Sequence, residues 1–184
     1  MIRDMPGDRP RTASSRVVYE NPWLRLREDE IVWPDGSPGI YAVIEKAPAA
    51  VVAAVEDGHV WMVEQHRYTV DRRMWELPQG AMDATQETDG EAIARTELLE
   101  ETGLRAAELR RLGRMYFAVG MSSQSFEGWV ATGLERGEPE PEATEQGLVA
   151  RPLPLDEVGR MVARGEIMDA ATVATLSLAG LLRL

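Results

Sequence analysis

The sequence predicts one mixed α/β (α+β) domain with additional antiparallel strands at its N-terminal end, and three observations lead to this class. Short segments of alternating apolar and polar residues, separated by turn-forming dipeptides, predict several strands. Three other segments, residues 90–102, 155–165 and 169–182, have the composition and end signals of helices. The chain has 184 residues, 44% of them hydrophobic and 28% charged, which suits a single globular domain and argues against a disordered or fibrous chain.

The strands are recognised by their alternation and by the turns between them. Asn21-Pro22 interrupts the first alternating segment, and Asp57-Gly58 is the dipeptide best suited to a tight hairpin turn. The predicted strands cover residues 16–32 in two parts, 40–45, 49–55, 60–65, 109–119 and 125–132. Residues 49–55 are almost continuously apolar, which is typical of a strand buried on both faces.

The helices are defined mainly by their ends. Thr88 and Glu91 have the spacing of a capping box before residues 90–102, and Gly103 is placed to end that helix. Asp169 has the side chain and position of an N-cap for the last helix. Residues 137–146, with two prolines and four glutamates, predict a loop.

These elements suggest three parts of the chain. Residues 1–15 mix charge with Pro, Gly and Ser and lack the apolar run of a signal peptide, so we expect a mobile tail. Residues 16–46 form N-terminal strands that could serve as a dimerisation element, and residues 47–184 form the main domain. The apolar stretch at residues 170–182 is too short for a membrane span.

Charge and cysteine content narrow the class of function. A formal charge of -11 repels the phosphate backbone of nucleic acids, so polymeric DNA or RNA is not an expected partner. The same charge repels a small phosphorylated ligand unless a local cation reverses the field. The absence of cysteine excludes disulfides, thiolate metal sites and cysteine nucleophiles, and it is compatible with a reducing cytoplasm, where we expect the protein.

Three glutamates share one face of the helix predicted over residues 90–102. At 3.6 residues per turn, Glu97, Glu100 and Glu101 fall within an arc of about 100°. Their mutual repulsion and their position in the last turns each destabilise the helix by roughly a few tenths of a kcal/mol. A hard divalent cation such as Mg²⁺ would offset that repulsion. The alternative interpretation is a solvated acidic face, which is common in glutamate-rich helices.

The end of this helix resembles the second half of the Nudix box, a metal-binding helix that ends in Glu-apolar-x-Glu-Glu-x-Gly-apolar. The residues that carry the resemblance are Glu97-Leu98-Leu99-Glu100-Glu101-Thr102-Gly103-Leu104, with Gly80 as the glycine that opens the box. The chain departs from the family pattern in two places. Six residues rather than five separate Gly80 from Glu87, and Thr96 stands where the family has an arginine, with Arg95 one position earlier. Arg95 has the spacing to pair with Glu91 instead.

Outside the box, the chain is most similar to the ADP-ribose pyrophosphatase branch of the family. The similar segments are Glu64-Gln65-His66-Arg67-Tyr68, Arg73-Met74-Trp75-Glu76-Leu77-Pro78-Gln79-Gly80, residues 142–151, and Asp169-Ala170-Ala171-Thr172-Val173-Ala174. Where related enzymes tend to carry Ser-Asp-Glu, this chain has Ser122-Ser123-Gln124, which removes one acid.

The resemblance implies a fold and a set of site residues. The fold is a Nudix-like α/β/α sandwich with a mixed β-sheet. The expected metal ligands, for Mg²⁺ or alternatively Mn²⁺, are Glu97, Glu100, Glu101 and the backbone carbonyl of Gln79, joined by Glu76. The expected substrate-binding residues are Arg67, Glu76, Trp75 and Tyr116, with Phe117 as a further aromatic. Glu145, or in its place Glu142, would position the attacking water.

Each assignment outside the metal set has a simpler alternative. Arg67 could form a surface ion pair, the aromatic residues could belong to the core, and the acidic loop that carries Glu145 could be solvated. The function implied is hydrolysis of ADP-ribose to AMP and ribose 5-phosphate by a homodimer. Other nucleoside diphosphate conjugates are an alternative substrate class. A non-catalytic nucleotide-sugar sensor and a purely structural acidic protein are alternatives from other classes.

Overall fold

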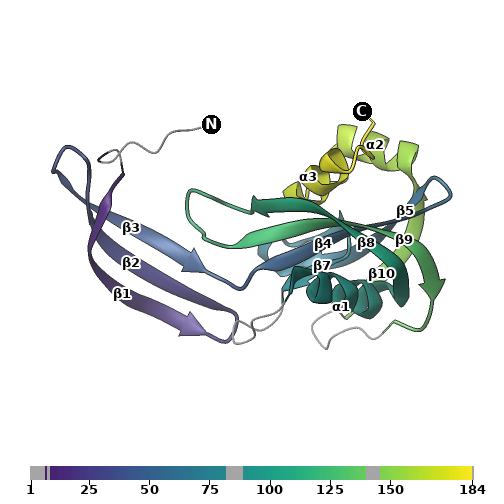
Figure 1. Cartoon of the computed structure of the whole chain (residues 1–184), viewed down its shortest axis with the longest axis horizontal. Helices are drawn as coiled ribbons and strands as arrows, with labels where there is room; N and C mark the ends of the chain where they lie inside the picture. Colours follow the sequence, from purple (N-terminus) through teal and green to yellow (C-terminus); the bar gives the residue numbers. More distant parts are fainter. Residues whose placement is uncertain (1–6, 8, 82–88, 140–145, 184) are drawn as a thin grey trace. The chain divides into compact units, whose positions relative to one another are not determined.

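The computed structural model describes residues 7, 9–81, 89–139 and 146–183. The chain forms two compact units, one made of residues 1–47 and 118–124 and the other of residues 48–117 and 125–184 (Figure 1). Within the described residues, no helix is long and apolar enough to span a membrane.

The first unit is a three-stranded antiparallel sheet in the order β1-β2-β3. Its strands are β1 (Arg11–Asn21), β2 (Leu24–Val32) and β3 (Pro38–Glu45). The side chain of Asn21 accepts hydrogen bonds from the backbone N–H groups of Trp23 and Leu24, both at 2.9 Å, and so closes the first turn. Ser122 adds an isolated parallel bridge to Ile44. The predicted interruption at Asn21-Pro22 therefore separates β1 from β2.

The start of β1 corrects the predicted tail. The strand begins at Arg11, so the assignment of residues 11–15 to a mobile tail was wrong. Polar partners on β2 explain why: the hydroxyl of Ser14 donates to Glu30 over 2.8 Å, and Arg16 pairs with Glu28 at 2.6 Å. A strand exposed along almost its whole length needs no apolar alternation, and its composition is therefore indistinguishable from that of a polar tail.

The second unit is built on a seven-stranded mixed sheet. Its order is β10-β5-β4-β9-β8, with β6 added to β5 and β7 added to β4. The strands are β4 (Ala49–Glu56), β5 (His59–Arg67), β6 (Arg72–Glu76), β7 (Gln79–Ala81), β8 (Leu104–Tyr116), β9 (Ser125–Arg136) and β10 (Val149–Pro154). The helices are α1 (Gly90–Thr102), α2 (Leu155–Ala163) and α3 (Ala170–Leu178), with a 3-10 turn at Tyr68–Val70. The β4–β9 pair is parallel and the other strand pairs are antiparallel, so the predicted mixed sheet is confirmed.

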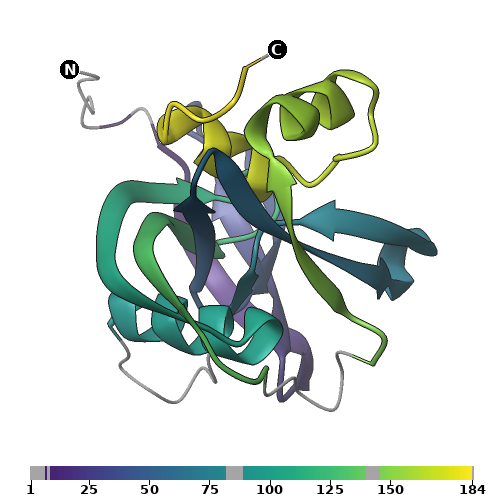
Figure 2. The same ribbon diagram turned by 90° about the vertical axis from the view of Figure 1, so that its right-hand side faces the viewer.

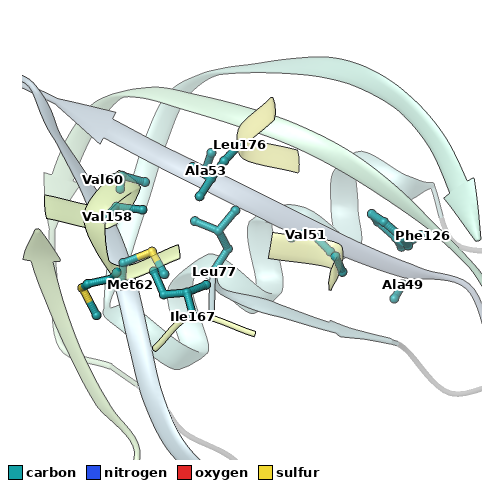
Figure 3. Packing of buried hydrophobic residues seen from close by; sticks show 12 residues of the cluster. Ala49, Val51, Ala53, Val60, Met62, Leu77, Phe126, Val158, Ile167 and Leu176 are labelled. Carbon is teal, nitrogen blue, oxygen red and sulfur yellow. The ribbon is translucent and has the colours of Figure 1, made fainter. Parts of the chain in front are cut away.

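Helices cover both faces of this sheet (Figures 1 and 2). Ala50, Val52 and Ala54 of β4 pack into one cluster with the apolar side of α1. Val51 and Ala53, which point to the other face, pack with α2 and α3 in a second cluster around Leu77 (Figure 3). Residues 49–54 of β4 are buried on both faces, so these positions are apolar and small, which explains the run of Ala and Val in the sequence. The α/β/α sandwich is thereby confirmed.

The helix ends agree with the predictions in part. α1 covers the predicted residues, but its N-cap is Asp89, whose side chain accepts from the N–H of Glu91; Thr88 of the predicted capping box lies outside the described residues. Asp169 caps α3 as predicted. α2 and α3 end earlier than predicted because the chain turns into left-handed conformations at Gly165 and Gly180. The apolar residues that follow α3 still pack on the core, which is why they extended the predicted helix.

Three short strands were not placed by the sequence pattern: β6, β7 and β10. β8 also begins at Leu104, directly after the glycine that ends α1, rather than at residue 109. β7 has only three residues, too few for two periods of alternation, and the sequence of β6, Arg-Arg-Met-Trp-Glu, does not alternate between apolar and polar residues.

Gly103 offers a test of how the end of α1 is built. Its φ is 70°, and a Cβ there would lie 2.6 Å from the carbonyl oxygen of Gly137. Gly180 has the same φ of 70° but open space around it. We expect Gly180→Ala to lower the free energy of unfolding by about 1–2 kcal/mol through backbone strain alone, and Gly103→Ala to lower it further through the added clash. Urea denaturation measures both; equal losses would mean that the contact with Gly137 is unimportant.

Candidate active site

The candidate site forms where the chain crosses from one strand ladder to another. Glu76, the last residue of β6, pairs with Val63 of β5, whereas Gln79, the first residue of β7, pairs with Val51 of β4. Between them, the carbonyl of Pro78 accepts a hydrogen bond of 2.9 Å from the N–H of Val52. Proline has no N–H of its own to satisfy, so it suits a position between two ladders. The predicted site residues Glu76 and Gln79 therefore lie at the two ends of this short crossing segment, one in each strand ladder.

The last turns of α1 lie against this segment. Glu101 is only 2% exposed, and its Oε2 accepts a hydrogen bond of 3.0 Å from the backbone N–H of Gln79. Glu97 is 8% exposed, and its carboxylate lies so close to Gly80 that a Cβ there would come within 2.5 Å of Cδ of Glu97. Glu100 is half-buried on the same helix. The alternative interpretation of a solvated acidic face is therefore wrong for Glu97 and Glu101, which are buried beside the crossing.

Arg67 and Glu76 form an ion pair at the edge of this cluster. Nε and Nη2 of Arg67 both donate to the buried carboxylate of Glu76, the Nε–Oε1 distance being 2.9 Å. This hydrogen bond raises the pKa of Arg67 above its ordinary value; burial opposes the rise, and the negative charges of Glu76, Glu101 and Asp169 add to it. Arg67 is thus the positive group among several acids, and it remains about 39% exposed.

The side chain of Gln79 connects the cluster to α3. Its Nε2 donates to Oε2 of Glu76 over 3.0 Å and to Oδ2 of Asp169 over 3.1 Å. The amide nitrogen has two N–H donors, and two acids accept from it, so its orientation is determined. The sequence pattern identified Asp169 only as a helix cap and did not place it at this site.

Arg95 holds the outer side of α1. It pairs with Glu91 at 2.8 Å, as the spacing predicted, and its Nη1 donates over 2.9 Å to the carbonyl of Ala106 on β8. Both side chains of the pair are more than 40% exposed, so the ion pair itself contributes little stability. Its effect is to tie the helix to the neighbouring strand.

Two family models cover most of this chain. Residues 45–175 match the NUDIX domain, and residues 11–44 match the nucleoside diphosphate sugar hydrolase N-terminal domain. The chain belongs to the Nudix family. The prediction of a Nudix pyrophosphohydrolase is confirmed, and both Gly80 and the residues 97–104 that carried the resemblance lie within the matched range.

Individual relatives agree with this assignment. The chain is 36% identical to an ADP-ribose pyrophosphatase of Mycobacterium tuberculosis over 165 residues, which cover 89% of this chain and 79% of that protein. It is 28% identical to a CMP-5'-(N-acetyl-N-hydroxy-3-aminopropyl)phosphonate hydrolase of Streptomyces rubellomurinus, over 90% of this chain and 80% of the relative. A crystal structure of an ADP compounds hydrolase matches the fold with a TM-score of 0.80 at 20% identity, covering 93% of this chain and 92% of that one.

The chemistry of the Nudix site suits a hard divalent cation. Within the described residues, no three acidic or histidine side chains converge into a ready-made metal cage. Mg²⁺ does not need one, because it keeps several waters and is usually held by one or two carboxylates and the substrate phosphates. The buried Glu97 and Glu101 have carboxylate oxygens that could bind such a cation, and Gly80 leaves space for the Glu97 carboxylate that any side chain would fill.

The aromatic candidates have different surroundings. The guanidinium of Arg151 lies 4.5 Å from the ring centroid of Trp75, so one face of that ring is already covered. Phe117 packs against the buried Phe126, with centroids 4.7 Å apart, but it is itself 39% exposed and does not belong to the core. Tyr116 is 54% exposed at the end of β8. Stacking of Trp75 or Tyr116 on a substrate stays a prediction.

Two groups of residues that the sequence analysis singled out are not part of the described site. Glu142 and Glu145, the candidates for positioning water, lie outside the described residues. Ser122-Ser123-Gln124 belong to the first unit, where the hydroxyl of Ser122 donates to the carbonyl of Ile44 and the side chain of Gln124 donates to the carbonyl of Ala47. These hydrogen bonds join residues 122–124 to the end of β3 and the residues that follow it.

Gly80 offers a test that separates metal binding from stability. We expect Gly80→Ala to weaken Mn²⁺ binding by about 10–100-fold, because the new methyl group displaces the carboxylate of Glu97. The melting temperature without metal should change little, since a carboxylate at the end of a flexible side chain can move. Calorimetric titration with Mn²⁺ and thermal melts measure the two effects. Gly120→Ala, which places a methyl group in open space, is the control and should bind as the wild type does. Unchanged binding by Gly80→Ala would exclude Glu97 as a ligand.

Proposed function

We propose that this Nudix enzyme hydrolyses ADP-ribose to AMP and ribose 5-phosphate with Mg²⁺, or alternatively Mn²⁺, as the cofactor. The observation that supports it most is the burial of Glu97 and Glu101 against the backbone of residues 79–80, at the place where the family holds its metals. The substrate is proposed because the relative with 36% identity is an ADP-ribose pyrophosphatase.

The reaction needs a water molecule, a stabilised diphosphate and a fixed geometry. Bound Mg²⁺ supplies neutralisation of the diphosphate charge and a water of lowered pKa. The oxygen of water adds to one phosphorus, and the bridging oxygen leaves with the other phosphate, so both products carry a terminal phosphate. Among the residues of the chain, Glu97, Glu100, Glu101 and the carbonyl of Gln79 would hold the metals.

The remaining residues act on the substrate and on water. Arg67, which is positively charged and partly exposed beside the acids, would contact a phosphate or the terminal sugar, with its planar guanidinium suited to oxygen pairs. To do so it would share its donors between Glu76 and the substrate. We propose that Glu145, or Glu142 in its place, positions the attacking water.

A second candidate substrate class is nucleotide-sugars and other nucleoside diphosphate conjugates. Two observations favour it: residues 11–44 match a nucleoside diphosphate sugar hydrolase N-terminal domain, and one relative acts on a CMP-phosphonate. The residues that hold the diphosphate are the same for both classes. A panel of such compounds, scored by phosphatase-coupled phosphate release, would identify the preferred group; a conjugate cleaved with higher kcat/KM than ADP-ribose would replace it in the proposal.

The exposed apolar residues of the first unit support a homodimer. Val17, Val18, Tyr19, Trp23 and Ile40 are all at least 50% exposed, and Trp23 reaches 72%. Apolar groups gathered on one small sheet favour association. We expect a dimer by light scattering, and Trp23→Glu should shift the protein toward monomer at micromolar concentration; a monomeric wild type would contradict the proposal.

We also propose a cytoplasmic location, which cell fractionation would test.

Glu101→Gln is the direct test of the reaction. It removes the charge of a proposed ligand. Changing a residue that only orients the metal ligands typically costs roughly 10–100-fold in activity, and we expect the rate of AMP formation with Mg²⁺ to fall by more than that. Glu91→Gln makes the same change on the exposed side of α1 and should keep nearly the full rate. Chromatography of the products measures both. Tight binding of ADP-ribose without turnover by the wild type would indicate a sensor instead of an enzyme.

A further inference from the structure

The crossing from β6 to β7 leaves backbone groups that no strand ladder can satisfy. The N–H of Leu77 follows the last paired residue of β6, and Leu77 is fully buried in the core between the sheet, α2 and α3. A buried N–H without a partner is strongly unfavourable. This N–H donates over 2.8 Å to the hydroxyl of Thr172, 95 positions later in the chain and also fully buried.

Thr172 and Asp169 form one unit at the start of α3. Oδ2 of Asp169 accepts from the N–H of Thr172 over 2.8 Å and from Nε2 of Gln79 over 3.1 Å. Asp169 therefore caps α3 and holds the Gln79 side chain with the same carboxylate oxygen. Together the two residues hold the segment at both ends, through the backbone of Leu77 and the side chain of Gln79.

On the other side, the segment is held by α1. The N–H of Gln79 donates to Glu101. Gln79, whose carbonyl is the expected metal ligand, is therefore held by α1 through its N–H and by α3 through its side chain, and α3 also holds the N–H of Leu77 two positions earlier. A shift at either side would move that carbonyl relative to the carboxylates of α1.

We propose that Asp169 and Thr172 are positioning residues that set the geometry of the metal site through the segment Leu77–Gln79. The proposal rests on the proposed function, since it requires that Gln79 and the glutamates of α1 hold the metal. It adds that α3, which supplies no proposed metal ligand of its own, determines how tightly the metal binds. Arg67 lies in the same network, because the charge of Asp169 acts on it together with those of Glu76 and Glu101.

The helix itself offers a matched pair of variants. Thr172 and Thr175 are both fully buried on α3, but among the described residues the hydroxyl of Thr175 has no hydrogen-bond partner. Replacement by valine keeps the shape of each side chain and removes the hydroxyl. Thr172→Val therefore removes the acceptor for Leu77, whereas Thr175→Val removes no hydrogen bond of the described structure.

We expect Thr172→Val to weaken Mn²⁺ binding, measured by calorimetry on folded protein, by about 10–100-fold, and to lower kcat for ADP-ribose with little change in KM. Amide exchange of Leu77 should accelerate in the same variant. Thr172→Ser restores the hydroxyl and should recover most of the Mn²⁺ affinity, and Thr175→Val should match the wild type. If Thr172→Val does not fold, Asp169→Ser is the second variant, because serine still caps α3 but is too short to reach Gln79.

The outcomes separate this proposal from the proposed function. If Thr172→Val and Asp169→Ser bind Mn²⁺ as tightly as Thr175→Val, the positioning role is wrong while the hydrolase proposal stands. If the wild type binds Mn²⁺ and the variants weaken in the expected order but ADP-ribose is not cleaved, the positioning role is supported and the substrate is wrong. If the wild type binds neither Mn²⁺ nor Mg²⁺, both proposals are overturned.

Discussion

The site depends on one hydrogen bond, from the backbone N–H of Gln79 to the buried carboxylate of Glu101. It joins the helix that carries the acids to the segment that crosses between two strand ladders. Burial of a carboxylate is favourable only where hydrogen bonds, ion pairs or a metal compensate for lost hydration. A backbone donor in a short strand is a rigid partner, so the helix and the segment hold each other in register.

The surrounding structure keeps this contact in place from two sides. β4 lies between the helix layers: its side chains pack alternately on α1 at one face of the sheet and on α2 and α3 at the other face. Small residues on β4 let both layers approach closely. Asp169 and Thr172 then add polar contacts to the crossing from α3. Both helix layers of the sandwich therefore contact the segment Leu77–Gln79, α1 from one side and α3 from the other.

The electrostatics of the site follow from the same arrangement. A protein of formal charge -11 that handles a diphosphate must reverse its own field locally. The acids at the crossing concentrate negative charge beside Arg67, whose pKa is raised by them. Such a cluster favours a divalent cation, and a bound cation in turn favours the phosphates. The same acidic residues that repel a phosphorylated substrate at long range therefore favour its binding at the site, through the cation that they attract.

The sequence by itself determined the local elements and the identity of the acids. The end of α1 could be predicted because the terminating Gly103 and the spacing of Glu97, Glu100 and Glu101 are local features of one helix. The first residues of β1 are exposed and show no apolar alternation, β6 has no alternation either, and β7 is too short to show one, so the sequence pattern does not identify them as strands. Only the tertiary structure decided that Thr172 meets Leu77 and that Asp169 meets Gln79. Those contacts join residues about 90 positions apart, and local periodicity has no information about partners at that distance.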